Sequence, residues 1–199
     1  TLANQNAGVD AYNVAVGYEA GYDITTGIYN TLVGGGAGNN LTTGARNVAI
    51  GFNTLGNEDA HGRNVAIGYT ALGNQDAGVD GYNVAIGYEA GGVVSTGTQN
   101  TLIGSLVGDA LTTGANNVAI GYKALSTEGI GHGSVAVGAF ALELLNSGNT
   151  YNTAVGFSAG ATISSGVENI LIGAYAGDAL TTGHYNVAIG MRALSAETA

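Results

Sequence analysis

The stretch Asn117–Leu125 reads Asn-Val-Ala-Ile-Gly-Tyr-Lys-Ala-Leu, and variants of it recur along the whole chain of 199 residues. Consecutive copies start 17 residues apart, except for one step of 19 residues and one of 18. The eleven copies start at Asn13, Asn30, Asn47, Asn64, Asn83, Asn100, Asn117, Ser134, Asn152, Asn169 and Asn186. A short fixed period is the signature of a solenoid, in which each repeat forms one coil.

The first five residues of each copy predict a short β-strand that ends in a turn. Within Asn117–Gly121, Val118 and Ile120 share one face of an extended segment, and Ala119 points to the other. The glycine that follows in all eleven copies indicates a positive φ or a close approach between coils. A second glycine, such as Gly114, recurs near the end of the repeat. We therefore predict two short strands and two tight turns per coil.

These features predict an all-β protein: a parallel β-solenoid of about eleven 17-residue coils forming a single array over residues 1–199. Glycine at two fixed places per repeat excludes helices, since each would cost about 1 kcal/mol in a helix interior. Residues 1–12 and 186–199 match parts of repeats, so we expect a segment of a longer fibre. A longer period of four coils shows in one column, which runs Gly21, Gly38, Leu55, Leu72, then Gly91, Gly108, Leu125, Leu142, then Gly160, Gly177, Leu194.

Composition narrows the classes of partner. The formal charge is −10 with only four Lys and Arg, which argues against DNA or RNA because so few cations cannot neutralise a phosphate backbone. The chain contains no cysteine, so it has neither disulfides nor thiolate metal sites. No apolar run is long enough for a membrane-spanning helix, so membrane insertion is not expected.

The strand is apolar on both faces, which bears on assembly. We expect Val118 and Ile120 to fill the inside of the coil, and the column that contains Ala119 to face outward. That column holds Ala, or Leu in one coil of each four, rather than charged side chains. Parallel copies packed around a common axis would cover it. The alternative is that Ala and Gly are small enough to remain exposed.

The phrase Asn-Val-Ala-Ile-Gly resembles the head repeats of trimeric autotransporter adhesins and the fibre repeats of tailed phages, notably marine and cyanobacterial phages. Copies that carry the resemblance lie at Asn13–Gly17, Asn47–Gly51, Asn64–Gly68, Asn83–Gly87, Asn117–Gly121 and Asn186–Gly190. The resemblance implies a left-handed β-roll, a homotrimer, an extracellular location on a virion fibre or bacterial surface, and attachment to a cell-surface glycan or protein receptor. The adhesin head repeats are typically shorter than 17 residues.

Two columns of side chains are candidates for surface contact. An aromatic column contains Tyr18, Tyr69, Tyr88 and Tyr122, which could stack on sugars or shield the bend. Threonine pairs containing Thr43, Thr113 and Thr182 resemble the threonine arrays of ice-binding solenoids, although two coils in four lack them. The alternative function is therefore a monomeric solenoid that binds a ligand such as ice through its threonine rows. The Asn column is interpreted as structural, with amides bonding one coil to the next.

We expect no enzyme, cofactor or metal site. Acidic residues near the turns are interpreted as solvated, because they form no calcium-binding loop of a known type; they are Glu58, Asp59, Asp76, Asp80, Asp109 and Asp178. His61, His132 and His184 lie in different coils and show no metal-ligand spacing. No nucleophile elbow or phosphate-binding loop occurs, and a regular rod offers no obvious catalytic cleft.

Overall fold

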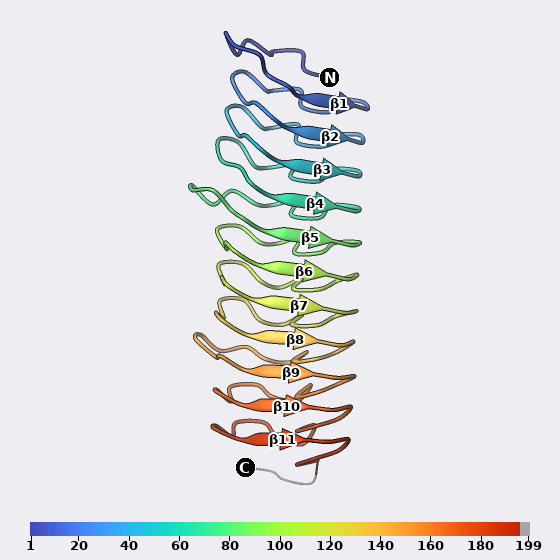
Figure 1. Cartoon of the computed structure of the whole chain (residues 1–199), viewed down its shortest axis with the longest axis vertical. Helices are drawn as coiled ribbons and strands as arrows, with labels where there is room; N and C mark the ends of the chain where they lie inside the picture. The colour runs from blue at the N-terminus through green and yellow to red at the C-terminus, as the bar shows by residue number, and fades with distance from the viewer. Residues whose placement is uncertain (196–199) are drawn as a thin grey trace.

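The computed structural model describes residues 1–195 and shows a single column of stacked coils (Figure 1). Each coil contributes one strand of three residues, and the eleven strands form one parallel sheet in chain order. The strands are β1 Val14–Val16, β2 Thr31–Val33, β3 Val48–Ile50, β4 Val65–Ile67, β5 Val84–Ile86, β6 Thr101–Ile103, β7 Val118–Ile120, β8 Val135–Val137, β9 Thr153–Val155, β10 Ile170–Ile172 and β11 Val187–Ile189. The predicted β-solenoid is confirmed.

Neighbouring strands pair so that equivalent residues of consecutive coils lie side by side, as Ala119 of β7 does with Ala136 of β8. At a strand spacing of about 4.8 Å, eleven strands give a rod about 50 Å long. The two longer steps of the sequence fall in the loops before β5 and β9, which project beyond the others in Figure 1.

The prediction of two strands per coil was wrong, because each coil of the described chain contains only one. The reason lies in the backbone after the strand. Gly121, Lys123 and Leu125 have φ values of 134°, 53° and 55°, so the chain bends repeatedly instead of extending. The coils are nevertheless bonded to one another in the bends, where the Leu125 N–H donates to the Ala141 carbonyl at 3.0 Å.

The glycine after each strand has the role expected from its fixed position. At Gly121 the positive φ is combined with close stacking, since a β-carbon there would lie 2.6 Å from the carbonyl carbon of Gly138 in the next coil. The second glycine column is required for close approach alone, because a β-carbon at Gly114 would lie 2.3 Å from the Gly131 carbonyl oxygen. No side chain fits at either position without moving the next coil.

The expected orientation of the strand was also wrong. The central Ala119 is buried at 0% exposure, whereas Val118 and Ile120 face outward and are only partly buried. The interior of the coil is completed by Ala124 and Leu125, also at 0% exposure. The central residue of each strand, Ala or in three coils Leu, therefore faces inward, and the two β-branched residues of each strand face out.

Side-chain sizes inside the coil compensate for one another. Where the central strand residue is Leu32, its methyl groups lie beside Gly21 and Gly38, in the space that β-carbons there would occupy. In the next coil the central residue is Ala49, and the glycine column instead holds Leu55, which is fully buried. The four-coil period therefore alternates two ways of filling the same interior volume.

A ladder of asparagines runs beside the core, which confirms the structural interpretation of this column. Asn100 is fully buried, its side-chain oxygen accepts the backbone N–H of Asn117 at 3.0 Å, and its Nδ2 donates to the Gly114 carbonyl at 2.9 Å. The Oδ1-to-N–H bond recurs at most steps, and at Ser134 the hydroxyl instead bonds to the Thr150 hydroxyl at 2.6 Å.

Candidate functional site

The outward side of the sheet is an extended, uncharged surface. We call it the aliphatic face, and it consists of the first and third residues of every strand. The third residue is Val or Ile in all eleven strands, and the first is Val or Ile in eight and Thr in three. None is charged. Exposure is greatest at the two ends of the rod, for example 50% at Val14 and 68% at Ile189.

The aliphatic face extends over about 500 Å², from a rod about 50 Å long and a three-residue strand about 10 Å wide. A contiguous apolar patch of this size is at the upper end of what monomeric soluble proteins expose, and such patches commonly mark interaction sites. An all-parallel sheet is also normally covered on both sides. Here the coil itself covers only the inner side.

Aromatic rings flank the aliphatic face where the strands end. Tyr69 and Tyr88 stack with ring centroids 5.3 Å apart, and Phe52 stacks on Tyr69 at 5.5 Å. We call these three rings the aromatic ladder. Tyr122 begins a second series of edge-to-face contacts with Phe140, which continues through Phe157 to Tyr175.

The four predicted tyrosines therefore do not form one site. The structure brings Tyr69 and Tyr88 together and places Tyr122 in the separate second series. Tyr18 is 78% exposed, and Gly35 takes the equivalent position in the next coil, so no ring lies there for it to stack on. A hydrogen bond to the Glu19 carboxylate and its negative charge raise the pKa of the Tyr18 phenol.

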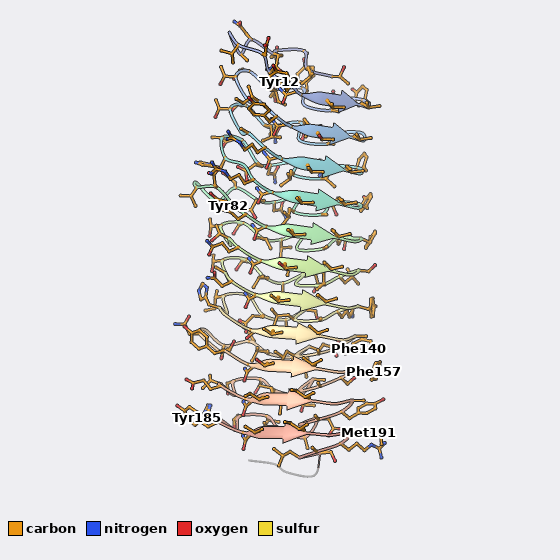
Figure 2. The ribbon with its side chains drawn as sticks, viewed as in Figure 1. Tyr12, Tyr82, Phe140, Phe157, Tyr185 and Met191 are labelled. Carbon is orange, nitrogen blue, oxygen red and sulfur yellow. The ribbon has the colours of Figure 1, made fainter. Side chains whose placement is uncertain are left out.

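A further column, at the other end of the strands, was missed by sequence reasoning. Tyr12 stacks on Tyr29 at 5.6 Å, and the Arg46 guanidinium lies over the Tyr29 ring at 5.5 Å. Arg63 lies over Tyr82 in the same way at 5.3 Å. Figure 2 shows Tyr82 and Tyr185 at this end of the strands, and Phe140, Phe157 and Met191 at the opposite end. The sequence does show this column, because the residue directly before the first Asn of a repeat is Tyr or Arg in many of the coils.

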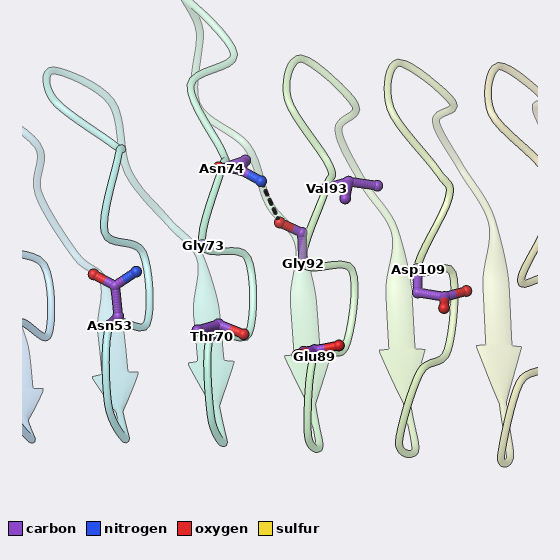
Figure 3. Close-up of a pocket in the computed structure, with 8 residues that line it drawn as sticks. All are labelled: Asn53, Thr70, Gly73, Asn74, Glu89, Gly92, Val93 and Asp109. Atoms are coloured by element: carbon purple, nitrogen blue, oxygen red, sulfur yellow. Dashed lines mark hydrogen bonds between the residues drawn. The ribbon is translucent and has the colours of Figure 1, made fainter.

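A groove lies beside the aromatic ladder, with polar groups along it (Figure 3). Its lining residues are Asn53, Thr70, Gly73, Asn74, Glu89, Gly92, Val93 and Asp109. Three of them directly follow the ladder residues in sequence, and interaction with the neighbouring Glu89 carboxylate raises the pKa of the Tyr88 phenol. Desolvation raises the pKa of the Asp109 carboxyl. The groove therefore combines the apolar faces of aromatic rings with carboxylate and amide groups.

The threonine positions form a sparse row. Thr43, Thr113 and Thr182 are all exposed, and the Thr43 hydroxyl donates to the Ala60 carbonyl at 3.3 Å. The first threonine of three pairs is used internally, because the hydroxyls of Thr25, Thr42 and Thr112 each donate to a carbonyl of the next coil. Two successive coils without threonine interrupt the row at residues 59–60 and 76–77, and two more do so at residues 129–130 and 146–147.

Glu58 corrects the interpretation of the acidic residues as solvated. Its side chain is fully buried, and its Oε1 accepts the His61 backbone N–H at 3.1 Å. Desolvation, together with the negative charges of Asp76 and Asp59, raises the pKa of Glu58 to about 7. The imidazole Nδ1 of His61 lies 3.9 Å from the Glu58 carboxylate, although His61 shows no metal-ligand spacing in the sequence.

Most of the other acidic and histidine side chains named above also contact the protein rather than solvent alone. Asp80 forms an ion pair with Arg63. The Nδ1 atom of His132 accepts the Ala115 backbone N–H at 2.9 Å, and that of His184 accepts the Val167 backbone N–H at 3.1 Å. Asp109 and Asp178 each have one buried carboxylate oxygen without a hydrogen-bond partner.

Comparisons with protein-family models, curated proteins and solved structures gave no match to this chain. Residues 1–195 contain no helix that is long and apolar enough to cross a membrane.

Proposed function

We propose that this chain is a segment of a homotrimeric attachment fibre, on a virion or a bacterial surface, that supports binding to a cell surface. The observation that carries the proposal is the aliphatic face. An eleven-stranded parallel sheet with uncharged β-branched side chains on its outer side has a surface that water solvates poorly.

Other copies of the same chain are the best-matched cover for this face. Every coil rises by the same strand spacing, so a parallel copy meets an equivalent row at each step along the whole rod. The absence of charge from the face means that no like charges would be buried against one another at a contact between copies, each of which carries a net charge of −10. The proposed number of chains in the assembly, three, comes from the resemblance to the repeats of trimeric adhesins and phage fibres.

The aromatic ladder and the groove beside it are the proposed contact surface for a receptor. Each trimer would present three copies of this surface, and simultaneous weak contacts multiply their effect through effective concentration. The ice-binding alternative receives less support, because the threonine rows are narrow and interrupted.

Charged substitutions on the aliphatic face test this proposal. Ile67→Glu combined with Ile103→Glu places two carboxylates within the face, whereas Ile130→Glu introduces the same change at a turn residue that is 53% exposed. We expect the wild type and the Ile130 variant to have three times the chain mass by light scattering, and the double variant to be a monomer with an unchanged circular dichroism spectrum. A double variant that stays trimeric would refute the role of this face.

A further inference from the structure

A buried carboxylate stands at a position where most coils have an aliphatic side chain. The equivalent residues in other coils are Ile24, Leu41, Val94, Leu111, Leu145, Ile163 and Leu180, all buried. Glu58 is 0% exposed, and its Oε2 has no hydrogen-bond partner. Leaving a buried acceptor unpaired destabilises the folded chain, so this oxygen requires an explanation.

The unpaired oxygen belongs to a cluster of four potential ligands. Each of Glu58, Asp59, His61 and Asp76 offers one ligand atom, and these atoms all lie within 4.8 Å of one another. The Nδ1 atom of His61 is also buried and has no hydrogen-bond partner. Asp59 and Asp76 are exposed, so the cluster has a fixed buried side and an open side through which an ion could enter.

We propose that Glu58, Asp59, His61 and Asp76 bind a divalent transition-metal cation, with Zn²⁺ as the best fit. Zn²⁺ binds both imidazole nitrogen and carboxylate oxygen, whereas Ca²⁺ takes oxygen ligands almost exclusively. Zinc ligands lie about 2.0–2.2 Å from the metal, so the two exposed aspartates would have to rotate to bring all four ligand atoms to bonding distance. The site does not depend on the proposed fibre function.

No positive side chain within the described residues takes the place of such an ion. The nearest guanidinium in sequence, that of Arg63, is paired with Asp80 and lies over the ring of Tyr82. The Glu58 carboxylate has His61 as its only ion-pair partner in residues 1–195. A cation would therefore satisfy both unpaired atoms, Glu58 Oε2 and His61 Nδ1.

The chain contains its own comparison, because the same buried glutamate recurs 70 residues later as Glu128. The positions equivalent to Asp59, His61 and Asp76 hold Gly129, Gly131 and Asn146, so that coil lacks the other ligands. Like Glu58, Glu128 accepts one backbone N–H, from Ser147 to its Oε2 at 3.4 Å, and has one buried oxygen, Oε1, without a partner. Its Cδ lies 2.3 Å from where a β-carbon at Gly131 would stand, so a residue with a side chain at that position would clash with the carboxylate. The surroundings of the two glutamates therefore differ at all three of the other potential ligand positions.

Calorimetric titration of the chelator-treated chain with ZnCl₂ tests the site. We expect one Zn²⁺ per chain in the wild type, and at least about tenfold weaker binding in Asp76→Asn, which changes only an exposed side chain, and in Glu58→Gln. Gln75 occupies the equivalent position in the following coil, so the fold accepts glutamine there. Glu128→Gln is the matched control and should bind as the wild type does.

Thermal unfolding provides a second readout, because an ion that binds only the folded chain raises its melting temperature. Zn²⁺ should raise the melting temperature of the wild type and of Glu128→Gln, and raise that of Asp76→Asn less. A wild type that binds no Zn²⁺ would overturn the proposal. Equal binding by Asp76→Asn and the wild type would also overturn it, as would binding of Ca²⁺ alone that is unchanged in His61→Ala.

Discussion

The asparagine ladder gives the sharpest prediction about what holds the coils together. Replacing Asn100 by Ala removes an amide that is fully buried in the middle of the rod. Its Nδ2 no longer donates to the Gly114 carbonyl, and its Oδ1 no longer accepts the Asn117 backbone N–H. The Asn117 Nδ2 loses its 3.2 Å bond to Asn100 Oδ1 but keeps its bond to the Gly131 carbonyl at 2.8 Å, so only two backbone groups are left without a partner.

The expected magnitude follows from those two groups. A buried donor or acceptor left without a partner costs about 1–3 kcal/mol, so Asn100→Ala should destabilise the chain by about 2–6 kcal/mol. Asn57→Ala is the matched control. It removes an exposed amide whose single bond, to Asn74 Oδ1, is 2.9 Å long, and it should cost about 0.5 kcal/mol or less.

Urea denaturation followed by circular dichroism, at one chain concentration, measures both variants. Because stability in a solenoid is close to a sum over coils and their interfaces, a weakened step in the middle should also broaden the transition or divide it in two. Equal shifts of the urea midpoint in Asn100→Ala and Asn57→Ala would refute the reasoning that the ladder is a main bond between coils.

Two further predictions concern titration and receptor contact. Burial raises the pKa of Glu128 from an ordinary 4.5 to about 7, so the folded chain holds this proton more tightly and loses about 3 kcal/mol of stability as the pH rises through that range. The free energy of unfolding of Glu128→Gln, measured with urea, should therefore increase relative to that of the wild type between about pH 5 and about pH 8. A difference between the two that does not change with pH would contradict this. Tyr69→Ala should weaken the binding of any glycan that the wild type retains on an array, whereas Tyr185→Ala should not; equal losses, or a wild type that retains no glycan, would contradict the ladder as a contact surface.

The period, the position of each strand and the role of the glycines were all predictable from the sequence. The fixed spacing of Asn117–Gly121 and its copies places this strand of each repeat in register with that of the next, because only equivalent residues can then stack. The missing second strand was not predictable from apolar patterning. It is excluded by left-handed backbone at residues such as Lys123, and side chains of that type give little warning of a positive φ.

The orientation of the strand could not be read from alternation alone, because both of its faces are apolar. A period of two shows which residues share a face, but it does not show which face lies inside the coil. The better signal was the matching of sizes, since Leu32 coincides with Gly21 and Gly38, and Ala49 coincides with Leu55. Residues that compensate in volume must share one closed space, and that places the central strand residue in the interior.

The cluster around Glu58 depended on the fold, because Asp76 lies in the coil after that of Glu58. Alignment of the coils would have shown Glu58 and Glu128 in a column of otherwise mostly aliphatic residues, which is the available signal for burial. The proximity of His61 to the carboxylate follows from the bend between them, which the sequence did not specify.

Light scattering of the unmodified chain over a range of concentrations shows whether the aliphatic face is covered by further copies. One chain has a mass of 19.6 kDa, and we expect a particle of three times that mass whose aliphatic faces cover one another. A particle that remains at the mass of a single chain at every concentration would contradict it, because the outer side of the parallel sheet would then be stable in water without any cover.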